Sequence, residues 1–196
     1  GSLYNNGPFT NCKNLIEVNV PSVTSIGKAA FAECTLLYKV SDLSKVEVLG
    51  DGAFKNCESL EFEDLSLPNL ETLGQDAFYG VSVKKISNLG KITALPTATT
   101  STQNFGRKDV LEEVVLPETV TSIPGASFSG YVNLTSINLN TIQEIGNTAM
   151  QRTAIFEAIL DNVVSIGAYA LSNCAQLKKV IVGNNITSIG EYSFQN

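Results

Sequence analysis

Apolar side chains return along this chain at a nearly constant interval. A large apolar residue, usually phenylalanine, occupies one slot of a recurring frame, and the steps from one such slot to the next are 23, 24, 27, 23, 22, 21 and 23 residues. The slots are Phe31, Phe54, Phe78, Phe105, Phe128, Met150, Leu171 and Phe194. A period in the twenties that persists over a whole chain is typical of a solenoid, in which each repeat contacts only its neighbours.

Each repeat contains a short alternating segment. In Val18-Asn19-Val20, Val114-Val115-Leu116 and Ile137-Asn138-Leu139 the first and third residues are apolar, so both point to one side of a strand. Leu65–Leu67 and Val180–Val182 fill the same place in their repeats. We therefore predict that these segments form one parallel sheet, in chain order, with a second short extended piece following each strand (residues 23–26 in the first complete repeat).

A different spacing follows the second extended piece. Between Gly27 and Cys34, apolar residues lie three and four positions apart, which favours one helical turn against the core. Pro96 and Pro124 occupy the slot held elsewhere by glycine, and proline cannot adopt positive φ. We therefore predict that this slot begins a short helix rather than a left-handed turn.

A family resemblance follows from the full frame. The segment Leu111 to Phe128 reads Leu-x-x-Val-x-Leu-Pro-x-x-Val-x-x-Ile-x-x-x-x-Phe, and Ala53 to Cys57 supplies Ala-Phe-x-x-Cys. It resembles the BspA-like (Treponema-type) leucine-rich repeats of bacterial surface proteins, over essentially the whole chain. The resemblance implies an α/β fold: a right-handed leucine-rich-repeat solenoid, with a parallel sheet on one face and short helices on the other.

The same frame predicts the domain organisation. Residues 1–196 form one leucine-rich-repeat domain of about eight repeats, each 21–27 residues long. Neither end shows a distinct polar cap, which a solenoid needs to cover its terminal core, so we expect a fragment of a longer array.

One repeat is longer than the others. Ten residues separate Leu95 from Phe105, where other copies have five, and the added residues are rich in threonine and serine. We predict a solvated bulge on the helix side of the solenoid. A binding function for loop 97–104 stays open.

Composition excludes some functions and disfavours others. Nineteen acidic and 13 basic side chains give a net charge of -6, without the basic face that nucleic acid requires. No apolar run approaches the ~18 residues needed to cross a bilayer, and no signal peptide is present in this sequence. Histidine is absent, which removes the commonest general base and metal ligand. We therefore predict neither a nucleic-acid partner nor membrane insertion, and no metal or other cofactor.

The cysteines share one slot of the repeat, three residues after the aromatic one. They are Cys12, Cys34, Cys57 and Cys174, and other copies place valine, lysine, tyrosine or threonine there. We predict four buried free thiols, because cysteine is a common buried small residue. A disulfide between adjacent repeats is the alternative. A metal site is disfavoured by the spacing of one cysteine per repeat.

Catalytic patterns are not found. The serines lack a partner base, the carboxylates are spread singly, and no glycine-rich phosphate loop follows a strand. We predict that the chain is not an enzyme.

The outward positions of the predicted sheet form two rows. The first alternates largely in charge, which favours an internally paired ladder over a site for a charged ligand. Its members are Glu17, Lys39, Asp64, Lys85, Glu113, Ser136, Glu157 and Lys179. The second row is polar in its first half (Asn19, Ser41, Ser66, Ser87) and mostly aliphatic in its second.

The aliphatic half of the second row is the candidate binding site. It comprises Val115, Asn138, Ile159 and Ile181, which we name the sheet-face patch. Exposed β-branched residues are good strand formers, and a clustered apolar stripe is also typical of an interaction surface. Both interpretations stay open at this point.

The family resemblance implies the function. It suggests a non-catalytic protein-binding or adhesion module, at the cell surface or secreted, with a host or matrix protein as partner. The alternative is a structural spacer that projects another domain. A carbohydrate-binding or carbohydrate-active module is less favoured, because the aromatic residues Tyr38 and Phe156 belong to distant repeats.

Overall fold

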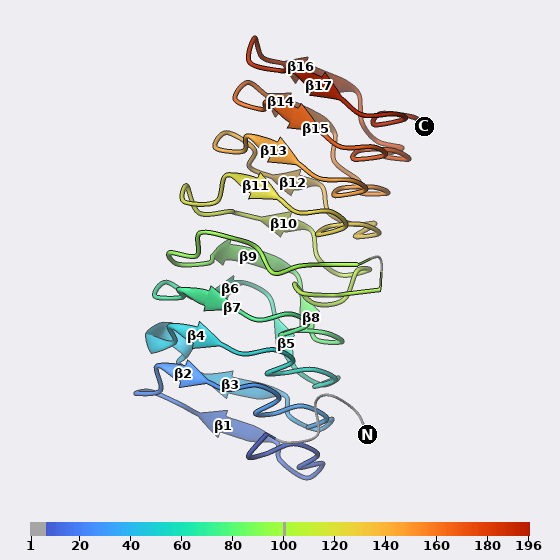
Figure 1. The fold of residues 1–196 in the computed structure, drawn as a ribbon. Helices are drawn as coiled ribbons and strands as arrows, with labels where there is room; N and C mark the ends of the chain where they lie inside the picture. Colours follow the sequence, from blue (N-terminus) through green and yellow to red (C-terminus); the bar gives the residue numbers. More distant parts are fainter. Residues whose placement is uncertain (1–6, 100) are drawn as a thin grey trace.

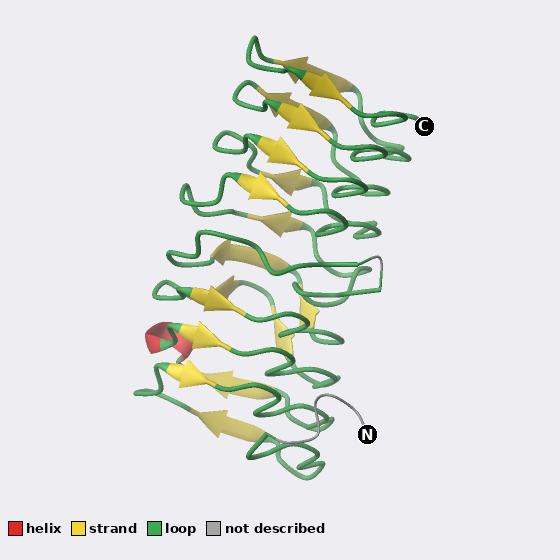
Figure 2. Cartoon of the chain, in the orientation of Figure 1, coloured by secondary structure: helices red, strands yellow, loops and turns green. Residues whose placement is uncertain are grey.

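The chain winds through stacked coils, each made by one copy of the repeat, with the N-terminal coil at one end and the C-terminal coil at the other (Figure 1). This is a computed structural model, which describes residues 7–99 and 101–196. Residues 1–6 and 100, which belong to the predicted domain, lie outside the described residues. The coils form a parallel β-solenoid with strands on two sides and turns on a third (Figure 2).

The first sheet is built from the predicted alternating segments, and every pair of its strands is parallel, as predicted. It is not continuous, however: its hydrogen-bonded groups are β1-β3, β6-β9-β10-β12 and β14-β16. The strands are β1 (Glu17–Asn19), β3 (Lys39–Ser41), β6 (Leu65–Ser66), β9 (Lys85–Asn88), β10 (Glu113–Val114), β12 (Ser136–Ile137), β14 (Glu157–Leu160) and β16 (Lys179–Val182).

The second extended piece of each repeat forms a second parallel sheet, in two groups. One contains β2 (Ser25–Ile26), β4 (Val48–Leu49) and β7 (Thr72–Leu73). The other contains β11 (Ser122–Ile123), β13 (Glu144–Ile145), β15 (Ser165–Ile166) and β17 (Ser188–Ile189). A further short pair joins β5 (Glu61–Phe62) to β8 (Ser82–Val83).

The predicted helices on the opposite face are wrong. The described residues contain one short 3-10 helix, η1 (Leu43–Lys45), which connects β3 to β4 (Figure 2). The segments predicted to be helical are successive turns, which we call the turn side.

The hydrogen bonds of the turn side explain the difference. Alternate N–H groups, such as those of Ala30 and Ala32, donate three residues back to Gly27 and Ala29. The N–H groups between them donate to the next coil: Phe31 donates to the Ala53 carbonyl at 2.8 Å. A helix would direct all its interior N–H groups into its own segment, so the apolar spacing fits both structures but the bonding fits only turns.

This bonding places two left-handed residues in most coils. One lies two residues after the glycine or proline slot, and the other two residues after the aromatic slot. The first set comprises Ala29, Gly52, Asp76, Ala126, Thr148, Tyr169 and Tyr192. The second comprises Asn11, Glu33, Asn56, Gly80, Gly130, Arg152 and Asn173.

The glycine slot has a different role from the one predicted. Gly50 and Gly167 have no positive φ, as predicted, but neither begins a helix. A Cβ atom built on Gly50 would lie 2.5 Å from the backbone nitrogen of Lys28 in the preceding coil, and one on Gly167 would lie 2.5 Å from that of Asn147. Glycine is needed here because adjacent coils approach too closely for a side chain.

The inward side chains form one hydrophobic core along the solenoid. Phenylalanines of the aromatic slot stack between coils, with ring centres 5.2 Å apart for Phe9 and Phe31, 5.4 Å for Phe31 and Phe54, and 5.9 Å for Phe54 and Phe78. A second stack begins with Phe105 and Phe128 at 4.9 Å. The long repeat lies between the two stacks.

All four cysteines are free thiols, but only three are buried. Cys34, Cys57 and Cys174 each donate from Sγ to the aromatic-slot carbonyl of the preceding coil, at 3.1, 3.1 and 3.2 Å. Cys12 is exposed, contrary to the prediction of a core position. Burial raises the pKa of the Cys34 thiol and raises that of Cys57 to about 12.

The strained left-handed positions give a stability prediction. Thr148 is β-branched and has φ of 55°, a conformation that costs an ordinary residue about 1–2 kcal/mol. Thr148→Gly should therefore stabilise the fold by up to about 1 kcal/mol after the added backbone entropy of glycine is subtracted. Thr121→Gly, at an exposed position without positive φ, should destabilise it. Chemical denaturation measures the free energy of unfolding of both variants. If both variants were stabilised, or both destabilised, the result would contradict the assigned backbone geometry.

Thiol accessibility gives a second prediction. A thiol reagent attacks the thiolate, so burial and a raised pKa should protect Cys34 and Cys57 at pH 8, and burial alone should protect Cys174. We expect the native protein to react rapidly at Cys12 only and the denatured, unreduced protein to react at all four cysteines. Mass spectrometry of the labelled peptides identifies the sites, and fewer than four in the denatured protein would indicate a disulfide.

Candidate functional site

Charged side chains pair across the outer face of the first sheet. Lys39 lies 2.6 Å from Glu17, and their strands are in register at this position. Glu113 lies opposite Lys85 at 3.1 Å, and Glu157 lies opposite Lys179 at 3.1 Å. The hydrogen bond from Lys39 to Glu17 raises the pKa of the lysine ammonium. These contacts confirm three of the predicted pairs of opposite charge.

The predicted continuity of this charged row is wrong at Asp64. Strand β3, which carries Lys39, pairs with β1 and not with β6. The Asp64 carboxylate instead accepts the backbone N–H of Ser87 at 3.2 Å, beside a register shift between Leu65 and Ser66. The same shift pairs Ser66 with Asn88 rather than with Ser87. Because β6 is irregular here, the Asp64 carboxylate pairs with a backbone N–H instead of with a neighbouring lysine.

Three members of the sheet-face patch present aliphatic side chains to solvent. Val115 is 38% exposed, Ile159 is 40% exposed and Ile181 is 39% exposed. Ile159 and Ile181 are direct partners in the parallel pair of β14 and β16. Val115 follows the last paired residue of β10, and its backbone N–H donates to the Ile86 carbonyl.

Asn138 has a structural role within this patch. Its Oδ1 accepts the Leu116 N–H at 2.6 Å, and its Nδ2 donates to the Leu116 carbonyl at 3.0 Å. The side-chain amide thus continues the ladder two residues beyond the end of β10. A partner on this face would meet an amide that already has backbone partners.

A shallow depression of about 280 Å³ lies beside the patch. Asn138 and Ile159 line it, together with Asn140, Asp161 and Asn162. Glu157 lines it as well, so the depression has an apolar wall and a rim of amides with two carboxylates. The first half of the same row, with Asn19, Ser41 and Ser66, offers no large apolar side chain.

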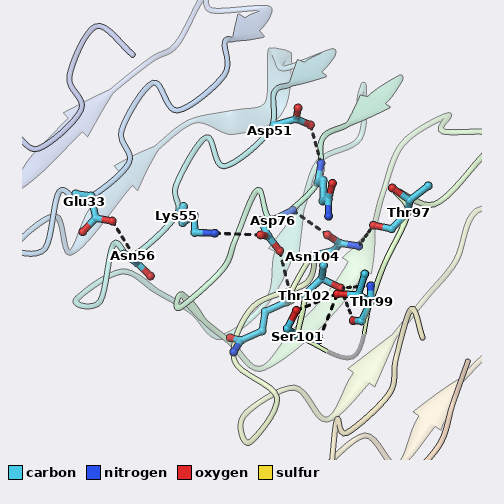
Figure 3. A network of polar contacts seen from close by, with 12 residues as sticks. Glu33, Asp51, Lys55, Asn56, Asp76, Thr97, Thr99, Ser101, Thr102 and Asn104 are labelled. Carbon is cyan, nitrogen blue, oxygen red and sulfur yellow. Dashed lines mark hydrogen bonds and ion pairs between the residues drawn. The ribbon is translucent and has the colours of Figure 1, made fainter. Parts of the chain in front are cut away.

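The long repeat is anchored by a buried polar network, which the sequence did not predict (Figure 3). The Asp76 carboxylate accepts Lys55 Nζ at 3.0 Å and the Gln103 N–H at 3.2 Å. The Asn104 amide accepts the Asp76 N–H at 2.8 Å and donates to the Pro96 and Thr97 carbonyls. Asp76 is only 7% exposed, so this ion pair lies largely out of water.

These contacts correct the predicted solvated bulge. Thr97, Thr99 and Ser101 are exposed, but Thr102 and Asn104 are buried. A spacing of 27 residues marks the place in the sequence, yet nothing in the sequence links Asp76 to Asn104. Tyr131 also holds the long repeat, because its hydroxyl accepts the Phe105 N–H at 3.3 Å and donates to the Gly106 carbonyl at 3.3 Å.

The described residues contain neither a metal-binding group nor a membrane-spanning helix. Within residues 7–99 and 101–196, no group of three or more cysteine and carboxylate side chains is placed to hold a metal ion. In the same described part of the chain, no helix has the length and hydropathy to span a bilayer. Tyr38 and Phe156 are 53% and 49% exposed and lie in coils far apart along the solenoid, as predicted (Figure 1).

Comparison with known families identifies the repeat. The family model for the BspA-type leucine-rich repeat region, with 6 copies, matches residues 4–101 and 98–196. The chain belongs to the BspA-type leucine-rich repeat family. The predicted resemblance is therefore confirmed, although this domain builds its third side from turns rather than helices.

Solved structures share the fold of this BspA-type domain. A leucine-rich repeat protein from Bacteroides ovatus is 19% identical with a TM-score of 0.61; the match covers 93% of this chain and 64% of that protein. The leucine-rich repeat protein of T. pallidum is 22% identical with a TM-score of 0.54, covering 87% and 68%. The pneumococcal vaccine antigen PcpA is 22% identical with a TM-score of 0.52, covering 93% and 56%. A search of the curated proteins found no match.

The charged row gives a salt-dependent prediction. Lys39→Glu places a carboxylate directly opposite Glu17, and like charges on neighbouring strands repel. We expect a lower melting temperature at low ionic strength and a smaller loss in high salt, because exposed charges are screened. Lys13→Glu, which changes the net charge equally but lies away from this row, is the matched control. Equal melting temperatures for the two variants would show that the Glu17–Lys39 pair contributes nothing.

Proposed function

We propose that this domain is a non-catalytic protein-binding module of a bacterial surface or secreted protein, and that its partner docks on the sheet-face patch. The observation that carries the proposal is the exposure of Ile159 and Ile181, which are direct partners on the adjacent strands β14 and β16. Apolar area in water is unfavourable by roughly 25 cal/mol per Å², which a partner surface would relieve.

The shape of the patch indicates the kind of partner. The depression of about 280 Å³ beside Ile159 accepts one protruding apolar side chain. Around it, Asp161, Asn140 and Asn162 offer a polar rim, as protein interfaces commonly have. A host or matrix protein that presents an apolar side chain flanked by hydrogen-bond donors fits this surface.

Family and fold support the cellular location. The BspA-type repeat is found in bacterial surface proteins, and a protein of the same fold is described as a pneumococcal vaccine antigen. Adhesion to a host protein is the specific form of binding that we propose. Projection of another domain as a spacer is the alternative, and it requires no partner.

The test distinguishes an interaction surface from β-branched residues that are present only because they favour strand structure. Ile159→Thr with Ile181→Thr keeps two β-branched residues on β14 and β16 but removes the aliphatic contact. We expect binding to a partner isolated with the wild-type domain to weaken at least about tenfold, equivalent to about 1.4 kcal/mol, with an unchanged melting temperature. Ile159→Lys with Ile181→Lys should abolish binding.

The control is the polar half of the same row. Ser41→Lys with Ser66→Lys adds the same charge to the first sheet and should leave binding intact. If both lysine pairs act alike, the partner does not use the sheet-face patch. If no partner of the wild-type domain is found among host and matrix proteins, the spacer function is favoured instead.

A further inference from the structure

The long repeat opens a second candidate site on the turn side, away from the sheet-face patch. In most coils the aromatic-slot N–H donates to the carbonyl of the next coil, as Phe54 does to Ala77 and Phe128 to Ala149. Between the coils of Phe78 and Phe105 the side chains of Asp76 and Asn104 make contacts in place of this bond, beside a backbone hydrogen bond from the Arg107 N–H to the Val81 carbonyl. The regular contact between coils is therefore replaced at this place.

A hollow of about 620 Å³ lies there, which we call the Tyr79 hollow. Its size falls within the range of about 300–1,000 Å³ typical of small-ligand sites. Three successive coils contribute to its lining, which comprises Asn56, Glu58, Tyr79, Gly80, Gln103, Arg107, Lys108 and Asp109. The sheet-face patch shares none of these residues.

Several of the lining side chains are held in place by partners. The Lys55 ammonium lies 4.4 Å from the centre of the Tyr79 ring. Asn56 Nδ2 donates to Glu33 at 2.8 Å, which fixes the orientation of its amide. Arg107 donates twice to Asp109, at 3.2 and 2.9 Å, and the guanidinium lowers the pKa of that carboxyl. Side chains that are already ordered lose less entropy when a ligand binds.

The chemistry of the lining matches a neutral, hydroxyl-rich ligand. Two acidic groups (Glu58 and Asp109) balance two basic groups (Arg107 and Lys108), so the hollow has no net charge to attract an ion. The amides of Asn56 and Gln103 offer both donors and acceptors, and each sugar hydroxyl can act as both. The Tyr79 ring adds an apolar surface with a polar tip, which suits the C–H face of a sugar ring.

Gln103 supplies an independent observation. Its Oε1 is the buried side-chain oxygen or nitrogen atom that lacks a hydrogen-bond partner within the described part of the chain. An unpaired buried acceptor is unfavourable, and such groups in native structures call for a partner. Gln103 also lines the Tyr79 hollow, so a ligand hydroxyl that reaches this side chain would supply the missing partner.

We propose that the Tyr79 hollow binds a neutral oligosaccharide, with the Tyr79 ring against a sugar face and the Asn56 and Gln103 amides on its hydroxyls. This site is independent of the protein-binding patch, and neither proposal requires the other. It also differs from the aromatic pair considered from the sequence, because Tyr79, Asn56 and Gln103 come from three consecutive coils.

The experiment titrates the isotope-labelled domain with a panel of neutral di- to tetrasaccharides and with acidic glycans of similar length. We expect at least one neutral saccharide to shift the amide resonances of Asn56, Gly80, Gln103 and Arg107, with an affinity insensitive to salt. Tyr79→Ala should weaken that binding at least about tenfold, whereas Tyr79→Phe should stay within about threefold. Tyr38→Ala, at an exposed tyrosine on another side, should bind like the wild type.

Several outcomes would overturn the proposal. They are the absence of any neutral-saccharide binding, binding of acidic glycans only, or shifts confined to residues outside the hollow. A peptide or protein segment occupying the hollow would also overturn it. If Tyr79→Ala fails to fold, the resonance map of the wild-type domain decides by itself, because it locates the ligand without any substitution.

Discussion

Close contact between adjacent coils is the constraint on which this fold depends. A coil of this length cannot satisfy its own backbone groups, so its N–H and C=O groups pair with those of the coils before and after it. On the turn side, alternate N–H groups close local turns and the others bind the next coil. That alternation imposes left-handed residues at fixed places and leaves no room for a side chain at Gly50 or Gly167. The phenylalanine stacks and the thiol hydrogen bonds follow the same coil-to-coil spacing.

The long repeat shows how the protein repairs a break in this constraint. Extra residues before Phe105 prevent the regular backbone pairing with the coil of Phe78. Hydrogen bonds of the Asp76 and Asn104 side chains join the Phe105 coil to the Phe78 coil, and the Tyr131 hydroxyl joins it to the coil that follows. Because an unpaired buried polar group is costly, side chains that replace backbone partners are essential here. The repair keeps one continuous core while it opens the Tyr79 hollow on the surface.

The two candidate sites arise from different properties of the solenoid. The sheet-face patch lies on regular strands. There, the residue type at one outward position per coil decides whether the surface is polar or aliphatic. The Tyr79 hollow lies at the irregular coil, and its walls come from three coils at once. Repetition thus supplies a long, gradually varying face. Both surfaces belong to a chain that spans 64% of the Bacteroides protein and 56% of the pneumococcal antigen.

From the sequence alone come the period, the strands of the first sheet, their parallel direction and the family. These follow from local alternation and from a spacing that recurs in every copy. The sequence also identified Val115, Ile159 and Ile181 as outward residues, because a strand alternates regardless of its neighbours. The folded structure resolves the choice between helix and turns, since both accept apolar residues three and four apart and differ in where alternate N–H groups donate. It likewise decided that Asn138 caps a ladder and that Asp76 meets Asn104, because those partners lie 22 to 28 residues away in the chain.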